Sequence, residues 1–547
     1  MTAFFAFIVA MFVTIVLMPP LMRAAQRFAF IDEPDQRKVH TCPIPRIGGV
    51  AMVTGAVIPM LLWLEPLPML RGYLFGVAVL LAFGLWDDRS GLDYRLKFLG
   101  QFIAVGLAVF DGGIVVHFVP FGDLDPIPVP ASIALTLFAL LGVTNAINLA
   151  DGLDGLAAGT TLLSLGVIVL LAYIGGDPVL LLMAMAVMGA IVGFLRFNTH
   201  PAQVFMGDAG SQFLGYSVGV LVIILTQQTN PALSPAMPLL LLGLPLIDTL
   251  LVMAERLRAG RSPFRPDRNH IHHKLLARGL DHYESVVVIY AVQGLLVTAA
   301  FVFRYNTDLL VTGTFLAALI VLAVLGRPGA ALLPRRPVGV PGAITRVAER
   351  LKRQAIQTRG PTMLAAVSLP LGGLFVAARL PALPVDGRVT LCALLGAALA
   401  GLAWRRLRPD IALVERLVLY VAMTAMIYYW CSARSQAGVL ALVENVYFGV
   451  LGVGLLVAYR YGQSSRLGVT PTDFLIVLIA LLVPTFARTL LPQPHVAEVG
   501  IKTLVAFYAA ELVLGAAGPR AGWMRLALTG VLAVVVLRLL GGDIVAT

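Results

Sequence analysis

The sequence predicts an all-α polytopic membrane protein, with about 11 transmembrane helices in residues 1–326 and about seven more in residues 361–547. Two properties carry this prediction. The 547 residues are 59% hydrophobic and 13% charged, whereas soluble domains are about half apolar and a quarter charged. The mean hydropathy is +0.90. The apolar runs are about 20 residues long, which matches a hydrocarbon core about 30 Å thick.

The spans of residues 1–326 are expected to follow one another closely along the chain. Segment 4–21 comes first, and it has neither a basic stretch before it nor a convincing small-residue cleavage site after it. It is therefore expected to stay as a span rather than to be removed as a signal peptide. The following spans are expected near 48–64, 72–86, 98–112, 131–147, 157–174, 178–195, 210–226, 236–254, 286–303 and 309–326.

Positive charges divide the connections between these spans into two sets. One set carries 16 Lys and Arg residues by count, and the opposite set carries two, Arg71 and Arg304. The basic set consists of the loops 22–47, 87–97, 148–156, 196–209 and 255–285. Because cytosolic loops collect Lys and Arg, we expect this set to face the cytosol and the N-terminus to face outward. Membrane topology thus explains the net charge of +11, and no nucleic-acid partner is expected.

Two further regions follow the first eleven spans. Residues 327–360 are rich in Pro and Arg and are expected to form a basic cytosolic linker. Residues 361–547 are expected to form an additional multi-span region, whose apolar segments contain Glu444 and Glu511. Ionisable groups at such positions are either functional or a pair that holds a helix bundle together, and the sequence leaves both open.

The polar clusters of the first 325 residues all fall in the basic set of loops. They are Arg37-Lys38-Val39-His40, Asp87-Asp88 with Lys97, the turn from Asn145 through Asn148 and Asp151 to Asp154, Asn198 with residues 205–211, and residues 266–273. Oxygen ligands such as those of Asp151 and Asp208 suit Mg²⁺, and Lys and Arg suit phosphate. Together they predict a site for phosphoryl transfer at one membrane face.

Each cluster also has a simpler interpretation. Asp87 and Asp88 by themselves are typical of a solvated helix end. The three histidines in residues 270–273 are compatible with a transition-metal site, because imidazole binds zinc. Arg265 and Arg268 beside them would repel a cation and attract phosphate, so we favour anion binding.

Four of these motifs, in order, resemble the polyprenyl-phosphate N-acetylhexosamine-1-phosphate transferases (glycosyltransferase family 4). The resemblance covers about residues 1–325 and rests on Asp87-Asp88, Asn-Leu-Ala-Asp-Gly-Leu-Asp-Gly at 148–155, Phe-Met-Gly-Asp-Ala-Gly-Ser at 205–211 and residues 266–273. The last motif, in which Ile271 interrupts the histidines, is similar to the branch that uses UDP-N-acetylglucosamine for O-antigen, enterobacterial common antigen or teichoic acid linkage. The branch that makes peptidoglycan usually has three consecutive histidines.

The resemblance implies roles for individual residues. Asp208, with Asn148 beside it, is implied as the Mg²⁺ ligand, with Mn²⁺ as the other cation considered. Asp87 and Asp88 are implied as the catalytic pair near the acceptor phosphate, and Asp151 and Asp154 as further catalytic carboxylates of the nucleotide-sugar and metal site. The substrate-binding residues implied are Lys38, His40, Lys97, Asn145, Asn198, Arg268, His270, His272 and His273.

The implied reaction transfers HexNAc-1-phosphate, in the first place GlcNAc-1-phosphate, from a UDP-sugar to undecaprenyl phosphate and releases UMP. The implied location is the bacterial inner membrane with the active site facing the cytosol, and a homodimer is among the assemblies considered. Because a phosphate monoester loses its second proton near pH ~6, the acceptor needs little general base, which favours direct attack. A covalent phospho-aspartate is the alternative mechanism.

The sequence has features in common with two other classes of protein. A transporter of lipid intermediates or solutes also has many spans and polar breaks, but it places its substrate site near the membrane midplane and often has repeated halves. Here the polar clusters lie at one face and the halves differ in motif content. A non-catalytic scaffold would not need several acidic clusters on one side.

Overall fold

A computed structural model of the chain describes residues 2–33, 43–122, 126–262 and 269–326, together with Ile427 and Lys502. Lys38, His40 and Arg268 lie outside the described residues, as do the predicted linker at 327–360 and nearly all of the predicted spans of 361–547. The domain limits proposed from the sequence therefore stay predictions.

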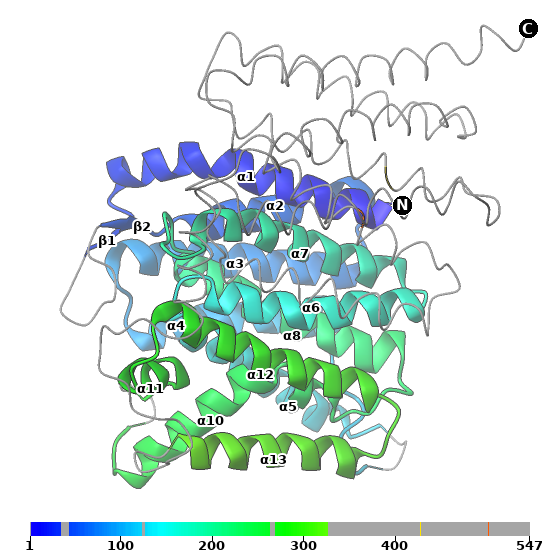
Figure 1. Cartoon of the computed structure of the whole chain (residues 1–547). Coiled ribbons are helices and arrows are strands. Elements are labelled where there is room, and N and C mark those ends of the chain that lie inside the picture. Colours follow the sequence, from blue (N-terminus) through cyan, green and yellow to red (C-terminus); the bar gives the residue numbers. More distant parts are fainter. Residues whose placement is uncertain are drawn as a thin grey trace, which may run out of the picture. The chain divides into compact units, whose positions relative to one another are not determined.

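The described part is a bundle of helices with one very short pair of strands (Figure 1). The helices that precede the acidic turn are α1 (Thr2–Phe28), α2 (Gly48–Trp63), α3 (Pro68–Ser90), α4 (Tyr94–Gly106), the π-helix η1 (Leu107–Asp111) and α5 (Val129–Ala150). Those that follow it are α6 (Leu156–Ile174), α7 (Pro178–Asn198), α8 (Gly207–Ile224), the π-helix η2 (Leu225–Thr229), α9 (Met237–Leu241), α10 (Gly243–Arg258), α11 (Ile271–Ala277), α12 (His282–Val302) and α13 (Asp308–Leu325). Strands β1 (Ile31–Asp32) and β2 (Ile44–Pro45) pair antiparallel.

Eight of the described helical segments are long and apolar enough to cross a membrane. This confirms a predominantly helical protein with several membrane-spanning segments. Each of the eleven predicted segments coincides with a helix or a pair of helices, but four differ from a full straight span. α2 has 16 residues, α4 continues as the π-helix η1, α8 continues as the π-helix η2, and the segment predicted at 236–254 is divided into α9 and α10.

The break between α9 and α10 has a clear chemical cause. Pro245 has no N–H, so it cannot donate to the carbonyl of Leu241 four residues earlier. That carbonyl instead accepts from Ser164 Oγ at 2.7 Å and from Gln293 Nε2 at 2.8 Å. Gln293 Oε1 in turn accepts from the backbone N–H of Leu244 at 3.0 Å. α6 and α12 therefore satisfy the backbone groups that the interrupted helix leaves free.

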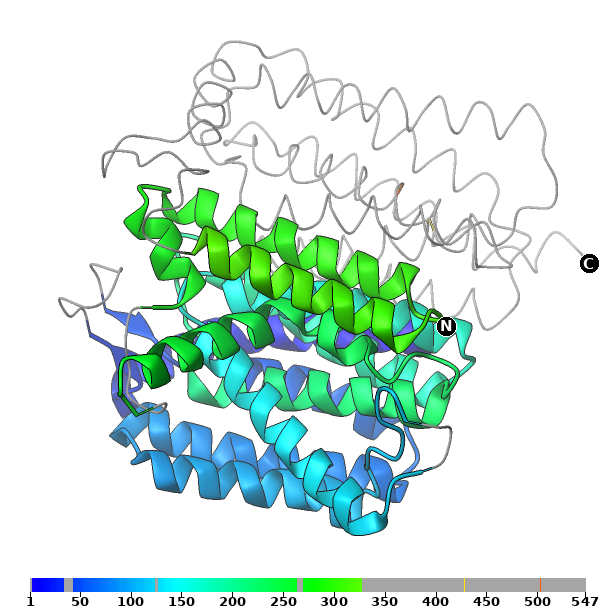
Figure 2. The ribbon, with the colours of Figure 1, turned by 90° about the horizontal axis from the view of Figure 1, so that it is seen from below.

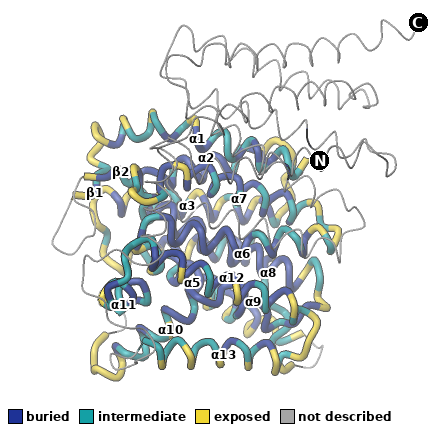
Figure 3. The backbone as a smooth tube through the Cα atoms, viewed as in Figure 1, coloured by how far each residue is buried: buried dark blue, intermediate teal, exposed yellow. Residues whose placement is uncertain are grey.

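Helix α8 lies at the centre of the described bundle, and its residues are buried along its length (Figure 3). Small residues allow its neighbours to approach closely. A Cβ on Gly49 of α2 would lie 2.4 Å from the backbone nitrogen of Gly210 in α8. By contrast, α13 is largely exposed, as expected for apolar side chains that face lipid. The start of α8, where Asp208 lies, is thus closely packed against α2.

The polar connections gather at one end of the bundle, where Figures 1 and 2 show the paired strands β1 and β2 in blue. The start of α2 lies there beside the segment that leads into α8. Backbone hydrogen bonds join these segments. Gly48 N donates to Phe205 O at 2.9 Å, and Phe205 N donates to Pro45 O at 2.8 Å. The predicted first and fourth loops of the basic set therefore lie side by side.

Candidate active site

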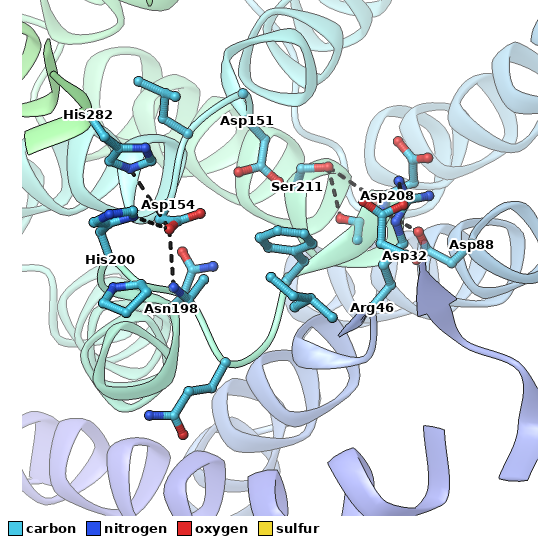
Figure 4. A pocket seen from close by; sticks show the side chains of 18 of the residues that line it. Asp32, Arg46, Asp88, Asp151, Asp154, Asn198, His200, Asp208, Ser211 and His282 are labelled. Atoms are coloured by element: carbon cyan, nitrogen blue, oxygen red, sulfur yellow. Dashed lines mark hydrogen bonds and ion pairs between the residues drawn. The ribbon is translucent and has the colours of Figure 1, made fainter. Parts of the chain in front are cut away.

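A cavity of about 740 Å³ opens at this end of the bundle (Figure 4). Seven of the residues expected in the site from the sequence line it: Asp88, Asn148, Asp151, Asp154, Asn198, Asp208 and His273. Other polar residues of its wall are Asp32, Arg46, His200, Gln203, Ser211 and His282. The cavity is large enough for a nucleotide-sized ligand, and its wall combines acidic and basic groups.

Asp208 is the centre of the acidic side of the cavity. It lies in the first turn of α8, and its Oδ1 accepts a hydrogen bond of 2.6 Å from Asn148 Nδ2. Lys97 Nζ lies 3.3 Å from the other oxygen, Asp208 Oδ2, and forms an ion pair with Asp87 as well. Lys97 thus joins two of the carboxylates and balances part of their charge.

Asp88 binds the backbone N–H groups at the start of α8. Its Oδ1 accepts from Asp208 N at 2.8 Å and its Oδ2 accepts from Ala209 N at 3.2 Å. These are N–H groups that a helix leaves without an internal partner at its N-terminus, where negative charge is also favourable. Gly207 has φ +68°, and a Cβ there would lie 2.4 Å from Asp88 Oδ2. Glycine at this position allows α3 and α8 to meet through this contact.

The turn between α5 and α6 carries Asp151 and Asp154 into the cavity. Gly155, with φ +76°, ends the turn, and its N–H donates to Asn198 Oδ1 at 2.8 Å. Tyr290 OH donates to the carbonyl of Gly155 at 2.6 Å. Asn198 Nδ2 also donates to Val204 O at 2.8 Å. Asn198 therefore lines the cavity and, in addition, ties this turn to the loop that precedes α8.

Asp154 has two histidine neighbours that were not expected from the sequence. Its Oδ2 lies 2.7 Å from His200 Nδ1 and 3.9 Å from His282 Nε2 (Figure 4). Neither ring nitrogen of the largely buried His282 has a hydrogen-bond partner. Burial by itself would raise the pKa of Asp154, but the His200 hydrogen bond, the His282 charge and the Ala202 N–H together hold that pKa below its usual value.

The ligand atoms of Asp154, His200 and His282 lie within 4.8 Å of one another, close enough for a shared metal ion. The orientation of the two rings does not favour one. Their centroids are 4.0 Å apart and their planes differ by only 21°. The lone pair of an imidazole nitrogen lies in the ring plane, so two stacked rings do not direct their lone pairs to one point. We therefore interpret this group as a hydrogen-bonded unit of the cavity wall.

The oxygen-rich side of the cavity fits a hard cation better. Burial, together with the nearby charges of Asp208, Asp154 and Asp88, raises the pKa of Asp151 to about 7. Carboxylates crowded in this way are stabilised by a divalent cation with oxygen ligands. Asp208, Asp151 and Asn148 are the residues here that would hold it. Two of these three, Asp208 and Asn148, were expected as metal ligands from the sequence.

A basic group, Arg46, lies on the same side of the cavity as the acidic residues Asp32 and Asp88 (Figure 4). Arg46 pairs with the buried Asp32 at 2.5 Å, and its own side chain is 35% exposed. Since both residues line the cavity, the Asp32 contact orients a guanidinium that remains accessible to an anion.

The predicted histidine residues separate into two groups. His273 lines the cavity, whereas His270 and His272 are buried and lie behind its wall. Asn145 also lies away from the cavity lining, and its amide donates to Gln101 Oε1 at 2.7 Å and to Leu141 O at 2.8 Å.

The sequence contained only weak signals for the residues that were missed. His200 follows Asn198 by two residues in a loop of the basic set, and His282 stands at the start of a span. Neither has a motif of its own. Asp32 stands next to Glu33, 14 positions before Arg46, and the pairing of β1 with β2 brings Asp32 and Arg46 together.

Comparison with known proteins places this site in a family. The chain is 34% identical over 329 residues to the "Probable undecaprenyl-phosphate N-acetylglucosaminyl 1-phosphate transferase" of Bacillus subtilis, covering 58% of this chain and 88% of that protein. The chain belongs to glycosyl transferase family 4. A profile of this family matches residues 70–226, which include Asp87, Asp151 and Asp208.

Two other relatives of this glycosyl transferase family 4 protein are similar over matches of comparable length. The chain is 37% identical over 309 residues to the "Decaprenyl-phosphate N-acetylglucosaminephosphotransferase" of Mycolicibacterium smegmatis, covering 50% of this chain and 76% of the relative. It is 30% identical over 292 residues to the "Undecaprenyl-phosphate alpha-N-acetylglucosaminyl 1-phosphate transferase" of Escherichia coli K12, covering 52% and 79%. The recognition of the family from its motifs is thus confirmed.

Proposed function

We propose that this protein transfers a HexNAc-1-phosphate, most directly GlcNAc-1-phosphate, from a UDP-sugar to undecaprenyl phosphate and releases UMP. The observation that carries the proposal is the convergence of Asp88, Asp151, Asp208 and Arg46 around one cavity in a family 4 membrane protein, with Lys97 Nζ 3.3 Å from Asp208 Oδ2. The names of the relatives support a polyprenyl-phosphate acceptor and the GlcNAc-1-phosphate group.

The reaction is a single phosphoryl substitution. An oxygen of the acceptor phosphate forms a bond to the β-phosphorus of the UDP-sugar, and the bond from that phosphorus to the bridging oxygen breaks. UMP leaves with the electron pair. The acceptor is already mostly a dianion at neutral pH, so positioning and charge neutralisation contribute more than proton removal.

We assign the roles by position around the cavity. Asp208, Asn148 and Asp151 would hold Mg²⁺, and Mn²⁺ suits the same oxygen ligands. When bound, the cation would neutralise charge on the phosphoryl oxygens. Lys97 balances Asp87 and Asp208, while Asp88 orients the start of α8. Arg46 and His273 are placed to contact the anionic donor.

The proposal extends to the side of the membrane on which the site lies and to the limits of the catalytic core. The excess of Lys and Arg in the loops around the cavity supports a cytosolic active site in a bacterial plasma membrane. The core is proposed to be residues 1–326, with 327–360 as a linker and 361–547 as a separate membrane region. A transporter is not favoured, because the polar groups meet at one end of the bundle rather than at its midpoint.

The direct test is transfer of radiolabel from UDP-[¹⁴C]GlcNAc to undecaprenyl phosphate by the purified protein, in parallel with UDP-GalNAc. We expect label in the lipid fraction and stoichiometric UMP from UDP-GlcNAc. If folded protein labels lipid from neither donor while binding undecaprenyl phosphate, the proposed donor is wrong. A covalent route would be supported by exchange of labelled UMP into UDP-sugar without lipid.

Proton release on cation binding is a separate expectation. The pKa of Asp151 is raised to about 7, so the side chain binds a proton over much of the range below pH 7. A cation binds the ionised form, and its affinity therefore increases with pH. For one group of this pKa, we expect Mg²⁺ affinity to rise about tenfold between pH 6 and pH 8, with proton release falling from about 0.9 to about 0.1 per ion.

Calorimetry of Mg²⁺ binding in buffers with different ionisation enthalpies measures this proton release. In Asp151→Asn the proton release should decrease. EDTA should remove activity in the wild-type protein until Mg²⁺ is restored. An affinity that does not change with pH, or that weakens as pH rises, would contradict the raised pKa of Asp151, and an unchanged Mg²⁺ affinity in Asp151→Asn would show that Asp151 does not take part in cation binding.

A further inference from the structure

Helix α11 is fixed to α10 by a buried carboxylate. Asp248 of α10 is 6% exposed. Its Oδ1 accepts from the backbone N–H of Ile271, the first residue of α11, at 2.8 Å. Its Oδ2 lies 2.9 Å from His270 Nδ1. A second contact, between Lys274 Nζ and Glu255 Oε1 at 2.6 Å, holds the two helices together further along. The position of α11 is thus set by two charged contacts.

From Asp248 the histidine side chains lead toward the cavity. The rings of His270 and His272 are nearly parallel, with centroids 5.8 Å apart and 8° between the planes. The ring of His273 follows at 4.2 Å from that of His272. Of these three residues, only His273 is part of the cavity lining.

His272 contacts the acidic turn from behind. A Cβ added to Gly152 would lie 2.2 Å from His272 Nε2 and 2.3 Å from its Cε1. The imidazole therefore lies directly against the backbone between Asp151 and Leu153. Burial lowers the pKa of His272 to about 3. The ring is neutral at physiological pH and brings no positive charge to an anionic donor.

We infer that Asp248, His270 and His272 are positioning residues that hold the turn carrying Asp151 and Asp154 against the cavity, and that His273 is the histidine of this motif that contacts the donor. This inference rests on the proposed function. The sequence implied that the histidines of residues 266–273 all bind substrate. In the structure His273 has the position of a contact residue, whereas His270 and His272 support the turn.

The contact between His272 and Gly152 allows a compensation test. Gly152 has no left-handed φ, so alanine there meets only the crowding by His272. We expect Gly152→Ala to lower kcat about 100-fold, because displacement of a turn by about 1 Å has effects of this size. His272→Ala opens the space, and we expect about a tenfold loss.

The double variant Gly152→Ala/His272→Ala distinguishes two roles of His272, which either supports the turn that carries Asp151 or contacts the donor directly. If His272 acts through the turn, the double variant should lose about tenfold, like His272→Ala, instead of the about 1,000-fold product of independent effects. Additive losses would overturn the inference. The matched pair Gly152→Ala/His273→Ala should be additive, because His273 acts on the donor side. Gly166→Ala, where a Cβ meets nothing within 4 Å, controls for alanine substitution in α6.

Thermal unfolding of the same proteins separates this inference from the proposed function. Gly152→Ala should lower Tm, and adding His272→Ala should recover part of the loss, whether or not the assay contains the right substrate. Absence of this recovery would overturn the contact. Recovery of Tm without recovery of kcat would overturn the positioning role. In a related test, Asp248→Leu should reduce kcat about tenfold more than Asp248→Asn, which keeps an acceptor for Ile271 N–H.

Discussion

Replacing Asp208 by Asn is expected to reduce transfer of labelled GlcNAc-1-phosphate about 1,000-fold or more, because it removes the carboxylate to which the other polar groups converge. Asn148 donates to its Oδ1 at 2.6 Å and Lys97 lies 3.3 Å from its Oδ2. An amide has the same shape, so the loss would report the missing charge rather than a change in packing. Initial rates with UDP-[¹⁴C]GlcNAc across a range of Mg²⁺ concentrations would measure it.

Asp93→Asn is the matched control for this variant. Asp93 precedes α4 at the same end of the bundle, is exposed and makes no side-chain capping hydrogen bond. It undergoes the same chemical change, and we expect a rate within about twofold of the wild type. If Asp208→Asn keeps more than a tenth of the wild-type rate at saturating Mg²⁺, Asp208 is not the principal ligand of the cation.

The second large effect is expected for Gly207→Ala. Its φ of +68° is unfavourable for alanine, and the added Cβ would lie 2.4 Å from Asp88 Oδ2. Asp88 would have to leave its contacts with the N–H groups of Asp208 and Ala209, which orient the start of α8. We expect kcat to fall about 100-fold and Tm to fall by several degrees.

Gly91→Ala separates the two causes of this effect. Gly91 ends α3 with φ +65°, but a Cβ there meets nothing within 4 Å. It therefore carries the same cost of a left-handed backbone, about 1 kcal/mol, without the contact to Asp88. Thermal unfolding and initial rates of both variants should show a smaller loss of Tm and near-normal activity for Gly91→Ala. Equal losses in both would mean that the Asp88 contact has no role.

The positions of the apolar helices in residues 1–326 followed from the sequence because the length and polarity of a segment are local properties. All eleven predicted segments coincide with described helices, and the residues of the basic loops meet at one end of the bundle. The prediction missed the division of 236–254, whose cause is local, because Pro245 has no N–H to donate to the carbonyl of Leu241. Only the tertiary structure shows that Ser164 and Gln293 donate to this carbonyl instead.

The family was identified from the sequence alone, since the Asp87-Asp88, 148–155 and 205–211 motifs each stand in one short segment. Four aspartates of these motifs, Asp88, Asp151, Asp154 and Asp208, line the cavity. Only the tertiary structure decided which side chains face the cavity. It places His200 and His282 beside Asp154, pairs Asp32 with Arg46, and turns His272 toward Gly152 instead of the cavity. The physical reason is that the direction of a side chain is set by its contacts with segments far away in the chain, and no spacing within one motif contains that information.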